Sequence, residues 1–269
     1  MVGMGAMIGA GIFVLTGLAA EIAGPAAILV FALNGVVTVL TGISYAELAS
    51  AIPKSGGGYV FVREVFSGPT SFLMGWMLSF AYMIAGALYA LGFSSNFVEF
   101  VHLYWAGLPT GPVWHILYAL IVVGLFALLN AVSTEASGGA ETIVTIIKII
   151  ILLIFAGFGA FAVQGGNFDP FFAKDNSSVA ILQAMGLTFI AFEGYDLIAT
   201  VTEEVENPRE NIPKAIFISL IATVAIYLLV VWVAIGTLGA AKLGQAGETG
   251  IAAAATSFMP TIPLLGAGA

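Results

Sequence analysis

The chain has 269 residues, of which 60% are hydrophobic and only 8% are Asp, Glu, Lys or Arg. A soluble domain carries about a quarter charged residues, so this composition excludes a soluble enzyme and a disordered protein. Fifteen acidic residues outnumber seven basic ones, which leaves too little positive charge for a nucleic-acid-binding face. Because there is no cysteine, disulfides and a cysteine zinc site are excluded as well. The composition indicates a polytopic membrane protein.

Long stretches without charged residues divide the chain into membrane spans. A helix needs about 20 apolar residues to cross the hydrocarbon core of a bilayer. Glycine–proline pairs, at Gly24-Pro25 and Gly68-Pro69, mark ends of these stretches. Seven spans are predicted, at about residues 2–22, 26–52, 70–100, 113–132, 141–162, 178–205 and 213–238.

The first predicted span is rich in glycine, with four glycines between Gly3 and Gly11. Each weakens a helix by about 1 kcal/mol relative to alanine. One interpretation is close packing of helices, since Gly5 and Gly9 form a GxxxG pattern. The other is a break in the helix, because irregular backbone at membrane depth is tolerated where it lines a cavity or meets a ligand.

Basic residues in the loops predict the orientation of the chain. If the first span starts in the cytoplasm, the cytoplasmic loops hold four basic residues, namely Lys54, Arg63, Arg209 and Lys214. The outer loops then hold only Lys174 and Lys242. This distribution follows the positive-inside rule.

Lys148 is a basic residue inside the fifth predicted span. A lysine at membrane depth costs from about 2.5 kcal/mol upward, so it needs a partner or a route to water. Burial favours its neutral amine, which would suit a proton carrier. The alternative is that its long side chain reaches the interface, near Glu141 two turns away.

The sixth predicted span contains two acids at membrane depth, Glu193 and Asp196, on either side of Gly194-Tyr195. Two interrupted helices five spans apart point to a secondary transporter with inverted repeats and a site at the bilayer midplane. Exposed N–H groups of a half-helix attract an anion and unwound carbonyls attract a cation, so a zwitterionic amino acid fits both. Glu193 could recognise a cationic side chain, carry protons or face water. Asp196 is expected to cap the second half-helix.

A charged turn follows the sixth span. Glu203, Glu204 and Glu206 could pair with Arg209 or Lys214 in a gate, and a solvated turn explains them equally well. No Walker motif, HExxH motif or nucleophile elbow occurs, and two histidines without cysteine make a poor metal site. We therefore expect no enzymatic activity, no cofactor and no metal.

Four stretches of the chain resemble segments typical of the amino acid–polyamine–organocation (APC) transporters, in particular the branch related to cationic amino acid transporters. They are Ile8-Gly9-Ala10-Gly11-Ile12-Phe13; Tyr45-Ala46-Glu47-Leu48 with Pro53-Lys54-Ser55-Gly56-Gly57-Gly58-Tyr59; Phe189-Ile190-Ala191-Phe192-Glu193-Gly194-Tyr195-Asp196; and Glu203-Glu204-Val205-Glu206-Asn207-Pro208 with Ile212-Pro213-Lys214-Ala215. Together they cover nearly the whole chain.

The resemblance implies an all-α, LeuT-like fold of two inverted five-helix repeats (5+5), with helices one and six broken. The chain would be one transmembrane domain, 1–269, holding about seven helices. Residues 1–165 would form the first repeat and residues 176–269 an incomplete second one. The segment from Gly239 to Pro260 would cap the site on the outside, and an eighth helix would begin near Leu264.

The resemblance also implies a substrate site at the two breaks. Backbone N–H groups of Ala10 and Gly11 would bind the substrate carboxylate. Carbonyls of Met7, Ile190 and Glu193 would receive the α-ammonium, while Phe192 and Ile190 would line the pocket. Many relatives have a hydroxyl residue at the position of Ala10 and several have an aromatic one at the position of Ile190, so those side-chain contacts would be absent.

For Lys148 the resemblance implies coupling to protons. Its ammonium would meet the carbonyls of Gly5 and Ile8, which ties the fifth helix to the broken first helix until deprotonation releases it. The predicted function is proton-coupled transport of amino acids, and the partners are an amino acid, the proton and the lipid bilayer of the cytoplasmic membrane. The alternatives are a sodium-coupled symporter or an exchanger on the same fold, and a receptor that binds amino acids without moving them.

Overall fold

The computed structural model describes residues 2–102, 104–105, 107, 109–132, 134–172 and 177–259. These residues form helices and turns, and no strand occurs among them. Six stretches are long and apolar enough to cross a membrane: Gly3–Ala51, Gly68–His102, Pro112–Val132, Glu141–Ala160, Ser178–Thr200 and Pro208–Leu238. The predictions for Lys174, Pro260 and Leu264 lie outside the described residues.

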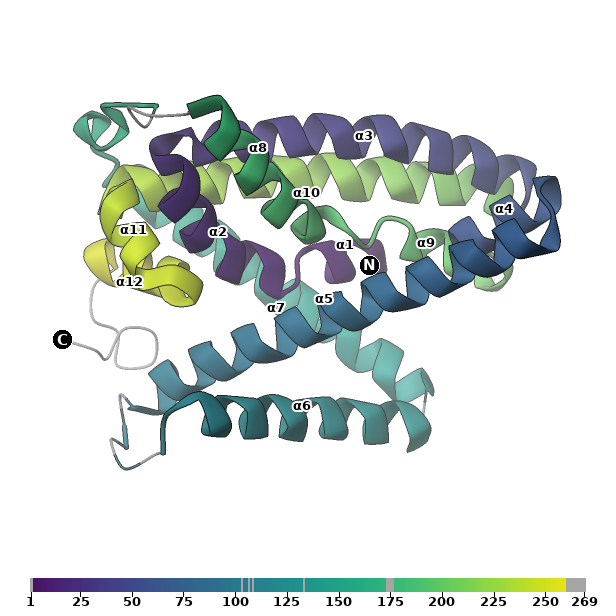
Figure 1. Cartoon of the computed structure of the whole chain (residues 1–269), viewed down its shortest axis with the longest axis horizontal. Helices are drawn as coiled ribbons and strands as arrows, with labels where there is room; N and C mark the ends of the chain where they lie inside the picture. Colours follow the sequence, from purple (N-terminus) through teal and green to yellow (C-terminus); the bar gives the residue numbers. More distant parts are fainter. Residues whose placement is uncertain are drawn as a thin grey trace.

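The stretch Gly3–Ala51 contains two of the seven predicted spans. Helices α1 (Val2–Met7) and α2 (Ala10–Ala23) form the first, and α3 (Ala27–Ala51) forms the second. A straight helix of 49 residues would be about 73 Å long, more than twice the thickness of the hydrocarbon core. The 3-10 turn Gly24–Ala26, with Pro25 at its start, reverses the chain between α2 and α3 (Figure 1).

The buried centre of the molecule lies where the broken spans meet two long helices. Helix α10 (Pro208–Leu238) packs along α3, and both run across the top of Figure 1. A polar contact also joins α3 to the sixth span: Asn34 Nδ2 donates to the carbonyl of Met185, at 3.0 Å, and to Thr188 Oγ1, at 2.9 Å. Both acceptors belong to α8 (Ser177–Thr188).

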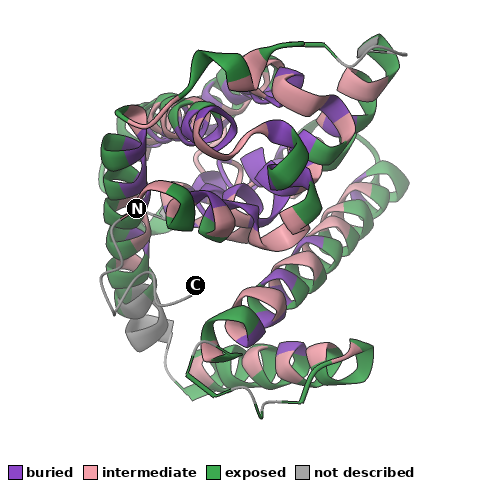
Figure 2. Cartoon of the chain, turned by 90° about the vertical axis from the view of Figure 1, so that its left-hand side faces the viewer, coloured by how far each residue is buried: buried purple, intermediate pink, exposed green. Residues whose placement is uncertain are grey.

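Three long helices leave much of their surface exposed. They are α5 (Gly68–His102), α6 (Pro112–Val132) and α7 (Thr134–Ala160). In α6, Ala119 is the only buried residue among those described. The exposed side chains of α5 and α6 are mostly apolar, as a membrane-embedded surface requires, and Figure 2 shows the contrast with the buried centre.

The two ends of the molecule are formed by different short elements. Short helix α4 (Gly57–Val65), the turn before it and the start of α10 gather at one end, on the right of Figure 1. This end carries the four basic residues predicted to be cytoplasmic, Lys54, Arg63, Arg209 and Lys214, together with Glu64, Glu203, Glu204, Glu206 and Glu210. At the other end, α11 (Ala240–Ala246), the turn Gly247–Thr249 and α12 (Gly250–Phe258) pack against α2.

Candidate functional site

The first span is broken after its sixth helical residue. Helix α1 ends at Met7 and α2 begins at Ala10, with Gly9 in an extended conformation (φ −94°, ψ −155°). The N–H of Gly9 donates to the carbonyl of Met7, at 2.7 Å, instead of the carbonyl of Gly5 four residues back. The N–H groups in the first turn of α2, those of Ala10 and Gly11 among them, have no partner within the helix. The break therefore offers donors to an anion.

The sixth span is broken over a longer stretch. After α8 the backbone changes to a 3-10 turn, Phe189–Phe192, and the following residue, Glu193, has an extended conformation. Gly194 has φ +125°, a conformation that side chains rarely adopt, and the four-residue helix α9 (Leu197–Thr200) follows. The 3-10 turn Thr202–Glu204 then leads toward α10.

The two breaks lie directly against each other. A Cβ added to Gly194 would lie 2.6 Å from Ala6 Cβ and 2.9 Å from the backbone nitrogen of Met7. A Cβ added to Gly11 would lie 2.8 Å from Ala191 Cα. Gly11 therefore serves close packing directly after the break in the first span.

The predicted substrate residues gather at this contact. Met7, Gly11 and Phe192 are buried, as is Ile8 beside them. Ala10, Ile190 and Glu193 are half-buried. Phe192 lies in an aromatic cluster whose ring centroids are 6.0 Å from Phe31 and 5.0 Å from Tyr227.

Two tyrosines that sequence reasoning missed bind the backbone of the breaks. The hydroxyl of Tyr227 in α10 contacts the carbonyls of Met7 and Ala191, the latter at 2.8 Å. The hydroxyl of Tyr89 in α5 donates to the carbonyl of Ile190 at 3.2 Å. Thus two of the three carbonyls expected to receive an ammonium already contact a hydroxyl. The sequence did contain a signal for both residues, because a tyrosine hydroxyl at membrane depth needs a polar partner.

The capping role predicted for Asp196 is wrong. Asp196 stands at the position before α9 but makes no capping bond to that helix. Its Oδ1 accepts a hydrogen bond from the N–H of Gly194, at 3.0 Å, and its Oδ2 accepts one from the hydroxyl of Tyr82 in α5. The reason is the turn at Gly194, which directs that N–H back toward residue 196, while a single-turn helix supplies only a weak dipole.

Lys148 reaches the first break. Its side chain is half-buried and Nζ donates to the carbonyl of Gly5 at 3.0 Å. This is the carbonyl that Gly9 leaves unpaired, so the break itself creates the acceptor. Among the described residues, the structure gives Lys148 no hydrogen bond to Ile8. Glu141 is close by, because a Cβ on Gly5 would lie 3.1 Å from its Oε1.

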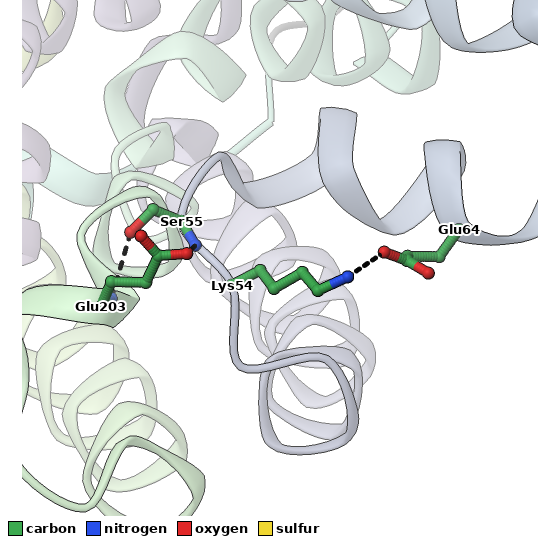
Figure 3. Close-up of polar contacts among 4 residues, drawn as sticks. All are labelled: Lys54, Ser55, Glu64 and Glu203. Atoms are coloured by element: carbon green, nitrogen blue, oxygen red, sulfur yellow. Dashed lines mark hydrogen bonds and ion pairs between the residues drawn. The ribbon is translucent and has the colours of Figure 1, made fainter.

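The acidic turn after α9 makes other contacts than those considered from the sequence (Figure 3). Lys214 pairs with Glu210 at 3.4 Å, one turn along its own helix, instead of with the glutamates of the turn. Lys54 hydrogen-bonds to Glu64 and holds the pKa of that carboxyl below its usual value. Glu203 exchanges hydrogen bonds with Ser55.

Comparisons with known proteins show the family of this chain. A protein-family model described as "Amino acid permease" matches residues 1–261. The branched-chain amino acid permease BcaP of Bacillus subtilis is 32% identical over 242 residues, which is 86% of this chain and 51% of that protein. The inner membrane transport protein YbaT of Escherichia coli is 31% identical over 272 residues, 98% of this chain and 59% of that protein.

The chain is also similar to a plant transporter. Cationic amino acid transporter 9, chloroplastic, of Arabidopsis thaliana is 31% identical over 243 residues, 85% of this chain and 42% of that protein. The chain spans about half the length of the curated relatives it matches. With its membrane-span helices, this is a multi-pass membrane protein. The chain belongs to the amino acid permease family, within the APC superfamily.

Proposed function

We propose that this protein is a secondary active transporter that moves amino acids across the cytoplasmic membrane with protons. The observation that carries the proposal is the contact between the two breaks, which puts N–H donors and carbonyl acceptors at one place. The names of its relatives support the amino acid transport in this proposal, since they include a branched-chain amino acid permease and a cationic amino acid transporter. The inverted-repeat arrangement, with repeats at 1–165 and from 176 onward, is part of this proposal.

The substrate would bind through its backbone atoms. Its carboxylate would accept hydrogen bonds from the N–H groups of Ala10 and Gly11, at the positive end of α2. Its ammonium would bind the carbonyls of Met7, Ile190 and Glu193. Because a carbonyl oxygen has two lone pairs, an ammonium can share it with a tyrosine hydroxyl.

Side chains of the sixth-span break would set the specificity for the substrate side chain. Ile190 and Phe192 would border the substrate side chain. Glu193 is half-buried at the break and would favour a cationic amino acid by charge pairing. Replacing Glu193 by glutamine would then shift preference toward neutral substrates.

Proton coupling would run through Lys148. In the protonated state its ammonium ties α7 to the first break through the carbonyl of Gly5. Loss of the proton would remove the charge from that bond and free the break to move. Thr145, one turn away on α7, is fully buried and its hydroxyl has no hydrogen-bond partner in the described part of the chain.

The test is uptake of radiolabelled amino acids into liposomes that contain the protein. We expect uptake to follow an imposed proton gradient, and Lys148→Ala to lower it by at least about tenfold, the loss expected when a charge-assisted hydrogen bond is removed. Lys242→Ala, which removes an exposed lysine of α11, is the matched control and should leave uptake unchanged.

Other results would select another function. Uptake that depends on sodium and survives Lys148→Ala would identify a sodium-coupled symporter. Exchange without any gradient dependence would identify an exchanger. Binding of amino acids without any flux would identify a receptor.

A further inference from the structure

We infer that Ser55 and Glu203 are positioning residues that fasten the half-helix α9 to the turn before α4. They come from two of the stretches that resemble APC transporters, although they are 148 residues apart in the chain. Their significance for transport rests on the proposed function, but the contact and its test do not.

The contact is reciprocal (Figure 3). The N–H of Glu203 donates to Ser55 Oγ at 3.1 Å, and the N–H of Ser55 donates to Glu203 Oε1 at 3.4 Å. Each turn thus uses a side chain to satisfy a backbone donor of the other, in the manner of a capping box at a helix start. Lys54 is engaged with Glu64, so it does not neutralise Glu203.

The residues after Ser55 continue the contact onto α9. Gly57 has φ +53°, and a Cβ there would lie 3.3 Å from Thr200 Cγ2 and 3.4 Å from the carbonyl oxygen of Asp196. Phe61 of α4 is buried in the same apolar cluster as Ile198 and Ala199. The turn and α4 therefore hold α9 along its whole length.

Helix α9 depends on such contacts because it is too short to be stable alone. It has four residues, and the 3-10 turn Phe189–Phe192 and residues 193–196 separate it from α8. It also packs against α1, since Gly3 lies beside Ile198. Its position therefore sets the end of both breaks that lies toward α4. The Ser55–Glu203 bonds are exposed to water, which makes them suited to breaking and re-forming as that end opens.

The test uses the absence of cysteine from the chain. Ala199 is fully buried in α9, so Ala199→Cys reports exposure of that helix through its rate of reaction with a maleimide, measured in liposomes without substrate. Ser55→Ala and Glu203→Ala should each raise this rate about fivefold, the change expected on losing one net hydrogen bond. Together they should raise it by less than the product, because either one opens the contact.

Conservative variants and controls separate this role from a general loss of structure. Ser55→Thr keeps a hydroxyl and Glu203→Gln keeps a carbonyl oxygen, so both should react at the original rate. Glu204→Ala removes an exposed acid of the same turn, and Ser50→Ala removes a hydroxyl bonded within α3; neither should change the rate. Equal rates in all variants, or Glu203→Gln as fast as Glu203→Ala, would overturn the inference. If the rates follow the expected pattern but no amino acid is transported, the proposed function fails and this inference stands.

Discussion

The two breaks that meet at the centre of the molecule are held in different ways. The first interrupts its helix at Ile8 and Gly9, and the N–H of Gly9 finds the carbonyl of Met7 within the same segment. The second covers a 3-10 turn and four further residues, and neighbouring spans supply its donors. In a membrane, freed backbone groups need partners from within the protein. Both breaks depend on other helices for these partners: Lys148 and Tyr227 bind carbonyls of the first, and Tyr89 and Tyr227 bind carbonyls of the second.

The neighbours of the second break lie on three continuous helices. Asn34 of α3 binds the end of α8, Tyr89 of α5 binds Ile190, and Tyr227 of α10 binds Ala191. Tyr227 also contacts the carbonyl of Met7, so it joins the two breaks. Both breaks should therefore be sensitive to single changes on other helices, the first at Lys148 and both of them at Tyr227.

The largest effect is expected at Gly11, in the first turn of α2 directly after the first break. A leucine there would project into the backbone of Ala191, because even a Cβ would lie 2.8 Å from Ala191 Cα. Overpacking of this kind costs about 1–3 kcal/mol, and here it also blocks the approach to the N–H groups. We expect Gly11→Leu to weaken amino acid binding by about 100-fold or more, measured by equilibrium binding.

Gly157→Ala is the control for that change. Gly157 lies in α7, and a Cβ there would meet no atom within 4 Å. Its binding should match that of the unaltered protein. Unchanged affinity in Gly11→Leu would show that the substrate site is elsewhere.

A smaller effect is expected from the tyrosines that hold the second break. Tyr227→Phe leaves the carbonyls of Met7 and Ala191 without this donor in a fully buried place, at a cost of about 1–3 kcal/mol in the free energy of unfolding. Tyr89→Phe removes a donor from one carbonyl in a half-buried place, so it should cost less. Thermal unfolding in detergent compares the two, and a larger loss for Tyr89→Phe would contradict this ranking.

The sequence predicted the spans and the position of the breaks from simple properties. Charge-free stretches marked the helices, and the clustered glycines and the acids around Gly194 marked the two interruptions. The side chains that bind the breaks were harder to predict from the sequence. Tyr89 and Tyr227 look like ordinary aromatic residues of apolar spans until the fold brings their hydroxyls to a backbone carbonyl. Asp196 shows the same limit. Its prediction assumed a regular half-helix start, while its contacts depend on the turn at Gly194 and on Tyr82 from another helix.

Cross-linking between the breaks tests the central claim most directly. A Cβ on Gly11 would lie 2.9 Å from Ala191 Cβ, so a shift of less than 1 Å brings cysteines at these positions to disulfide distance. In this cysteine-free chain, Gly11→Cys with Ala191→Cys should form an intramolecular disulfide under mild oxidation in the membrane, while Gly157→Cys with Ala191→Cys should not. If the first pair links no faster than the second, the two breaks do not face each other and the proposed site does not exist.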